Sequence, residues 1–123
     1  MREIKKFDIF RHFKGGIYVI LDISDGYNED NLFTNSKISE PASDIAFSSD
    51  DCQKEIDLRC CDTENGKKYF LTEPIFDSNK KYVIYKDLYN NIIWVRELEE
   101  FLSEVDSEKY PYVAQKYRFE KLN

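Results

Sequence analysis

Three of the arginines and several aromatic residues are the side chains with the clearest capacity for ligand chemistry. A guanidinium can bind a phosphate or a carboxylate through two parallel hydrogen bonds. An aromatic face can stack on a nucleobase or pack against a peptide. The candidate ligand-binding residues are Arg11, Tyr18, Tyr85, Trp94, Arg96 and Arg118. These residue types predict binding of an anionic small molecule, such as a nucleotide, without a chemical reaction on it.

Two other interpretations of the same residues remain open. In the first, most of the aromatic side chains fill the core and the arginines pair with surface carboxylates. In the second, the aromatic surface and the acidic middle of the chain contact a partner protein, so that the domain is a protein-protein interaction module.

The stretch around His12 does not predict an enzyme. His12 is the only histidine of the chain, and no serine, cysteine or carboxylate stands near it in a recognised nucleophile arrangement. Lys14, Gly15 and Gly16 do not match a phosphate-binding loop, because the lysine precedes the glycines and a β-type sequence follows them. We therefore expect a structural histidine and a tight glycine turn.

The cysteines do not predict a metal site or a cofactor. Cys52, Cys60 and Cys61 are odd in number, and the adjacent pair lacks a second pair at zinc-ligand spacing. Reduced thiols packed as small apolar groups are the simpler interpretation.

The charge distribution argues against general DNA or RNA binding. The chain has a formal net charge of −6, whereas phosphate neutralisation needs a basic surface. Residues 22–65 hold twelve acidic and three basic residues, a balance of −9 that leaves +3 for the rest of the chain. An anionic ligand would therefore meet the two flanks rather than the middle.

No segment predicts contact with a membrane. No stretch approaches the roughly 18 apolar residues of a membrane span, and the first residues lack the apolar centre of a secretory signal. We expect a cytoplasmic protein.

Both flanks carry β-type patterns. Residues 16–23 predict a strand between turn residues, and residues 82–89 and 92–97 predict a hairpin with Asn90 and Asn91 in a two-residue turn. Apolar residues spaced by three and four predict an amphipathic helix of about two turns over residues 97–105. The C-terminal tail offers a closing strand around Tyr117 and Phe119.

The middle of the chain gives a weaker pattern. Residues 56–60 and 67–71 predict one hairpin around the turn at residues 64–66. A chain of 123 residues suits one hydrophobic core. We therefore predict a single domain over residues 1–123, built from residues 9–24 and 80–123, with an inserted elaboration at residues 25–79.

Four segments, in order, resemble a small bacterial and phage family of unknown function, DUF1653. They are residues 11–19 (RHFKGGIYV), 82–89 (YVIYKDLY), 94–101 (WVRELEEF) and 118–119 (RF). The resemblance covers about half the chain. The sequence departs from the family pattern at Glu97, where a proline is usual, and in the long link from Asp25 to Asn79.

The resemblance implies an SH3-like β-barrel, which agrees with the strands expected from the residues. The predicted fold is thus mainly β (α+β): an SH3-like barrel with an inserted region and a short C-terminal amphipathic helix. The family brings no established activity. A homo-oligomer that enlarges its ligand site at a subunit interface, of phage or prophage origin, fits the expected role of a protein that sequesters a nucleotide.

Overall fold

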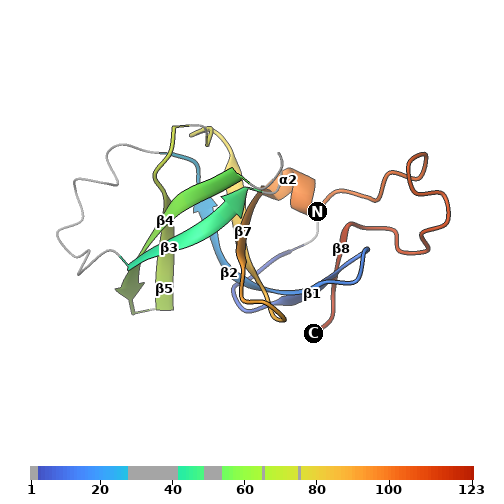
Figure 1. The fold of residues 1–123 in the computed structure, drawn as a ribbon, viewed down its shortest axis with the longest axis horizontal. Coiled ribbons are helices and arrows are strands. Elements are labelled where there is room, and N and C mark those ends of the chain that lie inside the picture. The colour runs from blue at the N-terminus through green and yellow to red at the C-terminus, as the bar shows by residue number, and fades with distance from the viewer. Residues whose placement is uncertain (1–2, 28–41, 49–53, 65, 75) are drawn as a thin grey trace.

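The computed structural model describes residues 3–27, 42–48, 54–64, 66–74 and 76–123 (Figure 1). This part of the chain is mainly β, with one short helix, α2 (Leu98–Phe101). The strands are β1 (Ile9–His12), β2 (Ile17–Asp25), β3 (Ala42–Ser48), β4 (Lys54–Thr63), β5 (Gly66–Leu71), β6 (Lys81–Asp87), β7 (Ile93–Glu97) and β8 (Phe119–Lys121).

The strands form one sheet with the order β5-β4-β3-β7-β6-β2-β1-β8. All neighbours are antiparallel except β3 and β7, which pair in parallel through Ala46–Ser48 and Ile93–Val95. Strands β1, β2, β6, β7 and β8 come from the two flanks of the chain, and the middle region adds β3, β4 and β5 beyond β7. Among the described residues the order ends at β5 and β8, so the sheet is not a closed barrel.

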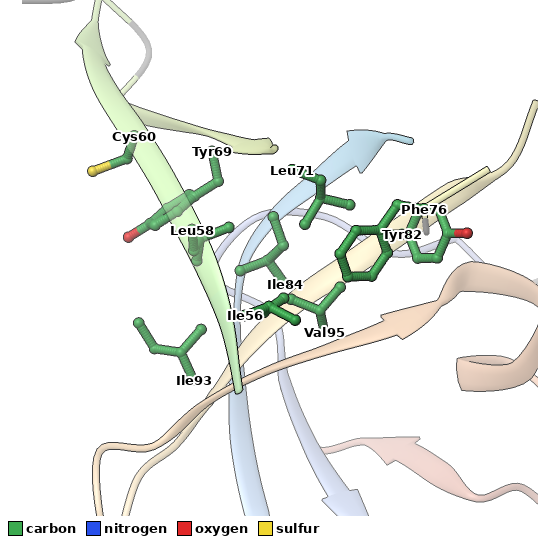
Figure 2. Close-up of a cluster of buried hydrophobic side chains, with 10 residues drawn as sticks. All are labelled: Ile56, Leu58, Cys60, Tyr69, Leu71, Phe76, Tyr82, Ile84, Ile93 and Val95. Carbon is green, nitrogen blue, oxygen red and sulfur yellow. The ribbon is translucent and has the colours of Figure 1, made fainter. Parts of the chain in front are cut away.

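The central strand β6 is buried on both faces because its side chains alternate between two apolar clusters. Tyr82 and Ile84 belong to the first cluster, which lies between β6, β7 and the added strands (Figure 2). Its buried members are Ile56, Leu58, Cys60, Tyr69, Leu71, Phe76, Tyr82, Ile84, Ile93 and Val95. Cys60 packs here as a small apolar group, as predicted for the cysteines, whereas Cys52 lies outside the described residues.

The second cluster covers the opposite face of β6 and is dominated by aromatic rings. Its buried members are Phe10, Ile20, Val83, Tyr85, Phe101 and Phe119. Phe101 of α2 and Phe119 of β8 stack with their ring centroids 4.0 Å apart and an interplanar angle of 10°. This pair attaches both the helix and the last strand to the sheet.

The first strands form a hairpin whose turn needs a glycine. Gly15 has φ of 106°, a left-handed conformation that other residues adopt only with strain. His12 and Gly16 close the turn, since the His12 N–H donates to the Gly16 carbonyl at 2.8 Å. The predicted glycine turn is confirmed, and β2 confirms the strand expected at residues 16–23.

The predicted hairpin of β6 and β7 is present, but its two-residue turn is wrong. The connection runs over residues 88–92, because the Asn91 N–H donates to the Asp87 carbonyl and Asn91 itself takes φ of 62°. The Asp87 carboxylate also accepts the Tyr89 N–H at 2.7 Å. These bonds stabilise a wider loop.

The predicted helix over residues 97–105 is reduced to the four residues of α2. The chain after it pairs with the C-terminal segment instead: the Val105 N–H donates to the Lys116 carbonyl at 2.8 Å, and the Arg118 N–H to the Ser103 carbonyl at 3.0 Å. These long-range bonds replace the helical bonds of a second turn. The segment between α2 and β8 then projects from the sheet (orange to red in Figure 1).

The predicted hairpin of the middle region is confirmed by β4 and β5, whereas the sequence pattern did not predict β3.

The sheet also curls, so that β5 lies against β2 although the two strands are far apart in the strand order. The buried carboxylate of Asp22 joins them by accepting the Tyr69 N–H at 2.9 Å, and it also accepts the Ile23 N–H. No helix among the described residues is long and apolar enough to cross a membrane.

Replacement of Asp22 tests this link between β2 and β5. In Asp22→Ala the buried Tyr69 N–H loses its acceptor, so we expect the free energy of unfolding in urea to fall by about 2 kcal/mol. Asp25→Ala is the matched control, because the Asp25 side chain is 68% exposed and its ion pair with Lys81 contributes less than about 1 kcal/mol. Equal losses in the two variants would contradict a structural role for the Asp22 carboxylate.

Candidate functional site

Arg96 is held against the aromatic cluster by the alternation of β7. Trp94 and Arg96 share one face of this strand, and Trp94 packs against the second cluster. The Arg96 side chain is only 12% exposed. Its Nε donates to the Tyr85 hydroxyl at 3.4 Å, and its guanidinium carbon lies 5.8 Å from the Phe119 ring centroid. Tyr85 is itself buried and therefore positions the guanidinium.

Glu100 bridges Arg96 to a second arginine. Since α2 begins directly after β7, Glu100 stands four residues beyond Arg96, and its Oε1 accepts Arg96 Nη1 at 2.5 Å. The same oxygen accepts Arg118 Nη1 at 3.2 Å. The side chains of Glu100 and Arg118 are 34% and 30% exposed. Two guanidinium groups thus share one carboxylate oxygen, and the trio carries a net charge of +1.

His12 lies beside this arginine pair and is uncharged at neutral pH. Its Nδ1 accepts the Lys14 N–H at 3.1 Å, which leaves Nε2 to carry the proton. Burial lowers the pKa of His12 from 6.5 to about 4, and the positive charges of Arg96, Arg118 and Lys14 add to the effect. Its ring packs between Phe13 and Phe119, with centroids 4.5 and 4.8 Å away. His12 is therefore packed between aromatic rings and hydrogen-bonded within its own turn.

Tyr18 forms part of the wall of the site. Its ring centroid lies 5.2 Å from that of Tyr85 and 5.9 Å from that of Phe119. Burial raises the pKa of Tyr18, with a further contribution from Asp87. At neutral pH its hydroxyl is therefore a neutral donor.

The structure brings four of the predicted site residues together. Tyr18, Tyr85 and Arg96 lie around Phe119, and Trp94 packs against the same cluster. Arg118 joins them through the carboxylate of Glu100. Arg11 does not join them. Its neighbours in β1, Phe10 and His12, point toward the aromatic cluster, so that Arg11 faces the other side, where it pairs with Glu120 at 3.7 Å.

Sequence reasoning did not single out Glu100 or Phe119 for the site. The spacing of Arg96 and Glu100 is the familiar four-residue spacing of a helical ion pair, and it could have indicated Glu100. Nothing local indicates that Phe119 reaches Arg96, because β8 and β7 are not neighbours in the sheet.

A groove lies on the other side of α2. Its volume is about 610 Å³, and Leu98 and Leu102 contribute apolar lining. The lysines at its rim are paired: Lys80 with Glu97 at 3.3 Å and Lys81 with Asp25 at 3.1 Å. The groove shares no lining residue with the arginine pair.

The fold and this site define a mainly β protein with a partly buried arginine pair at the edge of an aromatic cluster. Residues 65–121, about half of the chain, match the family model described as "Protein of unknown function (DUF1653)". This part of the chain therefore belongs to the DUF1653 family. It contains Arg96, Glu100 and Arg118, whereas His12 and Tyr18 lie outside the match. No curated protein and no solved structure matches the chain.

The environment of His12 predicts its titration. Its folded-state pKa lies below the unfolded value, so the unfolded chain binds a proton that the folded chain does not between about pH 6.5 and 4. The stability that this contributes is present above pH 6.5 and is lost as the pH falls. Because the ring is partly exposed, we expect a loss of about 1 kcal/mol between pH 7 and pH 5.

His12 is the only histidine, so its proton resonance can be followed by NMR without ambiguity. We expect a midpoint near pH 4, and the variant His12→Gln should lose the corresponding pH dependence of stability. A midpoint near pH 6.5 would contradict the packed environment.

Proposed function

We propose that the protein is a non-enzymatic binding protein that holds an anionic small molecule, such as a nucleotide, at Arg96 and Arg118. The observation that supports this most directly is the sharing of one Glu100 oxygen by two guanidinium groups. The excess positive charge is set among aromatic rings, which limits access of water. In such surroundings a charge-assisted hydrogen bond to an anion is stronger than at an open surface.

Glu100 acts in this proposal as an internal stand-in for the ligand. Its carboxylate occupies the position that a phosphate or carboxylate of the ligand takes, and its side chain is 34% exposed, so it can turn toward water. A phosphate carries more charge and more acceptor oxygens than the carboxylate it displaces. Binding then exchanges one charged partner of the arginines for a stronger one.

The proposal also includes the type of β fold. We infer that the flanking strands form an SH3-like barrel that the middle region opens and extends. Support comes from the five successive antiparallel strands β8, β1, β2, β6 and β7, and from the way in which β5 folds over β2. A cytoplasmic homo-oligomer of bacterial or phage origin completes the proposal.

A protein-protein interaction module is the second candidate, and exposed aromatic rings favour it. Tyr89 and Tyr112 are 80% and 99% exposed. Large exposed aromatic residues are enriched at protein interfaces. A stoichiometric partner protein retained in a pull-down, together with no response to nucleotides, would favour this role over the first.

A nucleotide panel tests ligand binding. We expect at least one nucleotide to raise the melting temperature of the wild-type protein, and native mass spectrometry to report the bound compound and the oligomer size together. Arg96→Ala removes the more buried guanidinium, so the affinity should fall by a factor of about 10 to 100.

The matched control is Arg11→Ala, since Arg11 lies on the opposite face and should leave the affinity unchanged. Circular dichroism of Arg96→Ala checks that the fold is kept, and Arg96→Lys, which keeps the charge without the planar fork, should bind with intermediate affinity. The absence of any shift across a broad panel would refute the proposed function.

Removal of the Glu100 carboxylate should raise the affinity for an anion, whereas Arg96→Ala lowers it. Glu100→Gln keeps the shape of the side chain but leaves the two guanidinium groups without their shared negative charge. We expect anion affinity to rise about tenfold, measured by isothermal titration calorimetry, because the ligand no longer competes with the carboxylate. Glu99→Gln, which changes the exposed neighbour of Glu100, is the control; an unchanged affinity in Glu100→Gln would contradict displacement.

A further inference from the structure

A second cationic cluster lies on the loop between α2 and β8, where it meets the first hairpin. Lys14 Nζ lies 5.3 Å from the ring centroid of Tyr110, and Lys109 Nζ lies 5.6 Å from the same centroid. A hydrogen bond from Lys14 is the main cause of a lowered pKa of Tyr110, and Lys109 adds to it. Two ammonium groups therefore converge on one phenol ring, and we name Lys14, Lys109 and Tyr110 the lysine cluster.

A continuous row of rings joins the lysine cluster to the arginine pair. The ring of Tyr110 contacts Phe13 with centroids 4.9 Å apart, Phe13 contacts His12 at 4.5 Å, and His12 contacts Phe119 at 4.8 Å. Arg96 lies at the Phe119 end of this row and Lys14 at the Tyr110 end. The row is fixed by backbone contacts as well, since the Phe13 N–H donates to the Arg118 carbonyl at 2.9 Å.

The loop that carries Tyr110 is fastened to this surface. The Gln115 side-chain amide donates to the Tyr117 carbonyl at 2.7 Å and to the Arg11 carbonyl at 3.2 Å. The Tyr110 N–H donates to the Asp106 carbonyl at 2.8 Å. The lysine cluster is thus a defined feature of the fold.

Two carboxylates of the loop that carries Tyr110, those of Asp106 and Glu104, interact with groups outside the lysine cluster or with the backbone. Asp106 accepts the backbone N–H groups of Glu108 and Lys109, and Glu104 pairs with Lys116 at 3.5 Å. Among the described residues no carboxylate forms an ion pair with Lys14 or Lys109 within 4.0 Å. Two separated positive centres, the partly buried arginine pair and the exposed lysines, therefore occur in a chain whose overall charge is −6.

We propose that the ligand is a nucleotide with two separated phosphate groups, one bound by the arginine pair and the other by the lysine cluster, with its nucleoside over the rings between them. This inference rests on the proposed function and specifies the ligand class. The rings of His12, Phe13 and Tyr110 are partly exposed along the row and offer apolar contact to a nucleoside. Two adjacent phosphates, as in a diphosphate chain, would place both charges at one end.

Four compounds separate the contributions of the nucleoside, the first phosphate and the second phosphate to binding. They are adenosine, adenosine 5′-monophosphate, adenosine 5′-diphosphate and adenosine 3′,5′-bisphosphate. We expect calorimetry to show affinity in that order, with the bisphosphate about tenfold tighter than the monophosphate. In the double variant Lys14→Ala/Lys109→Ala this tenfold difference should disappear while the affinity for the monophosphate is kept. Lys80→Ala/Lys81→Ala, at the groove beyond α2, is the matched control and should keep the difference.

The outcomes distinguish this inference from the proposed function. If the bisphosphate and the monophosphate bind equally and both need Arg96, the proposed function stands and the inference is wrong. If the tenfold difference persists in Lys14→Ala/Lys109→Ala, the second phosphate binds elsewhere and the inference is also wrong. If none of the four compounds binds, the inference is wrong, and the broad nucleotide panel decides the proposed function.

Discussion

The stacked pair of Phe101 and Phe119 is the contact on which the second half of the structure depends. It joins a one-turn helix and a three-residue strand, neither of which is long enough to be stable without tertiary packing. Burying two phenyl rings contributes about 2 kcal/mol or more for each ring. The same Phe119 ring contacts His12 and Tyr18 and supports Arg96, so the packing that closes the fold also builds the candidate site.

Local sequence patterns predicted the strands in which apolar residues follow the two-residue period of β structure. Residues 16–23 and the two arms of the later hairpin are of this kind, because alternation or a continuous β-branched run is decided by neighbours in the chain. The sequence indicated Tyr85, Arg96 and Arg118 as candidate ligand-binding residues by their types. It did not indicate that the three side chains lie close together.

Features decided by distant partners could not be predicted. The strand β3 pairs in parallel with β7, and the helix ends early because Val105 and Ser103 bond to the C-terminal segment. Lys14 and Tyr110 are far apart in sequence and meet only because the loop after α2 returns to the first hairpin. Arg11 was wrongly grouped with the other site residues. Its residue type suits an anion site, but its position in β1 places its side chain on the other face of the sheet.

The distribution of charge explains how an acidic chain can present a cationic surface. The acidic residues are concentrated at residues 22–65. Asp22 and Asp25 lie in β2, whereas β3, β4 and β5 of that region join the sheet beyond β7 in the strand order. The basic flanks meet instead at His12, where Arg96, Arg118 and Lys14 all act on one imidazole. An uncharged histidine at this point avoids adding a further positive charge. Electrostatic repulsion among the cations thus favours an anion that lies between them, and the Glu100 carboxylate, which pairs with both Arg96 and Arg118, meets part of that demand.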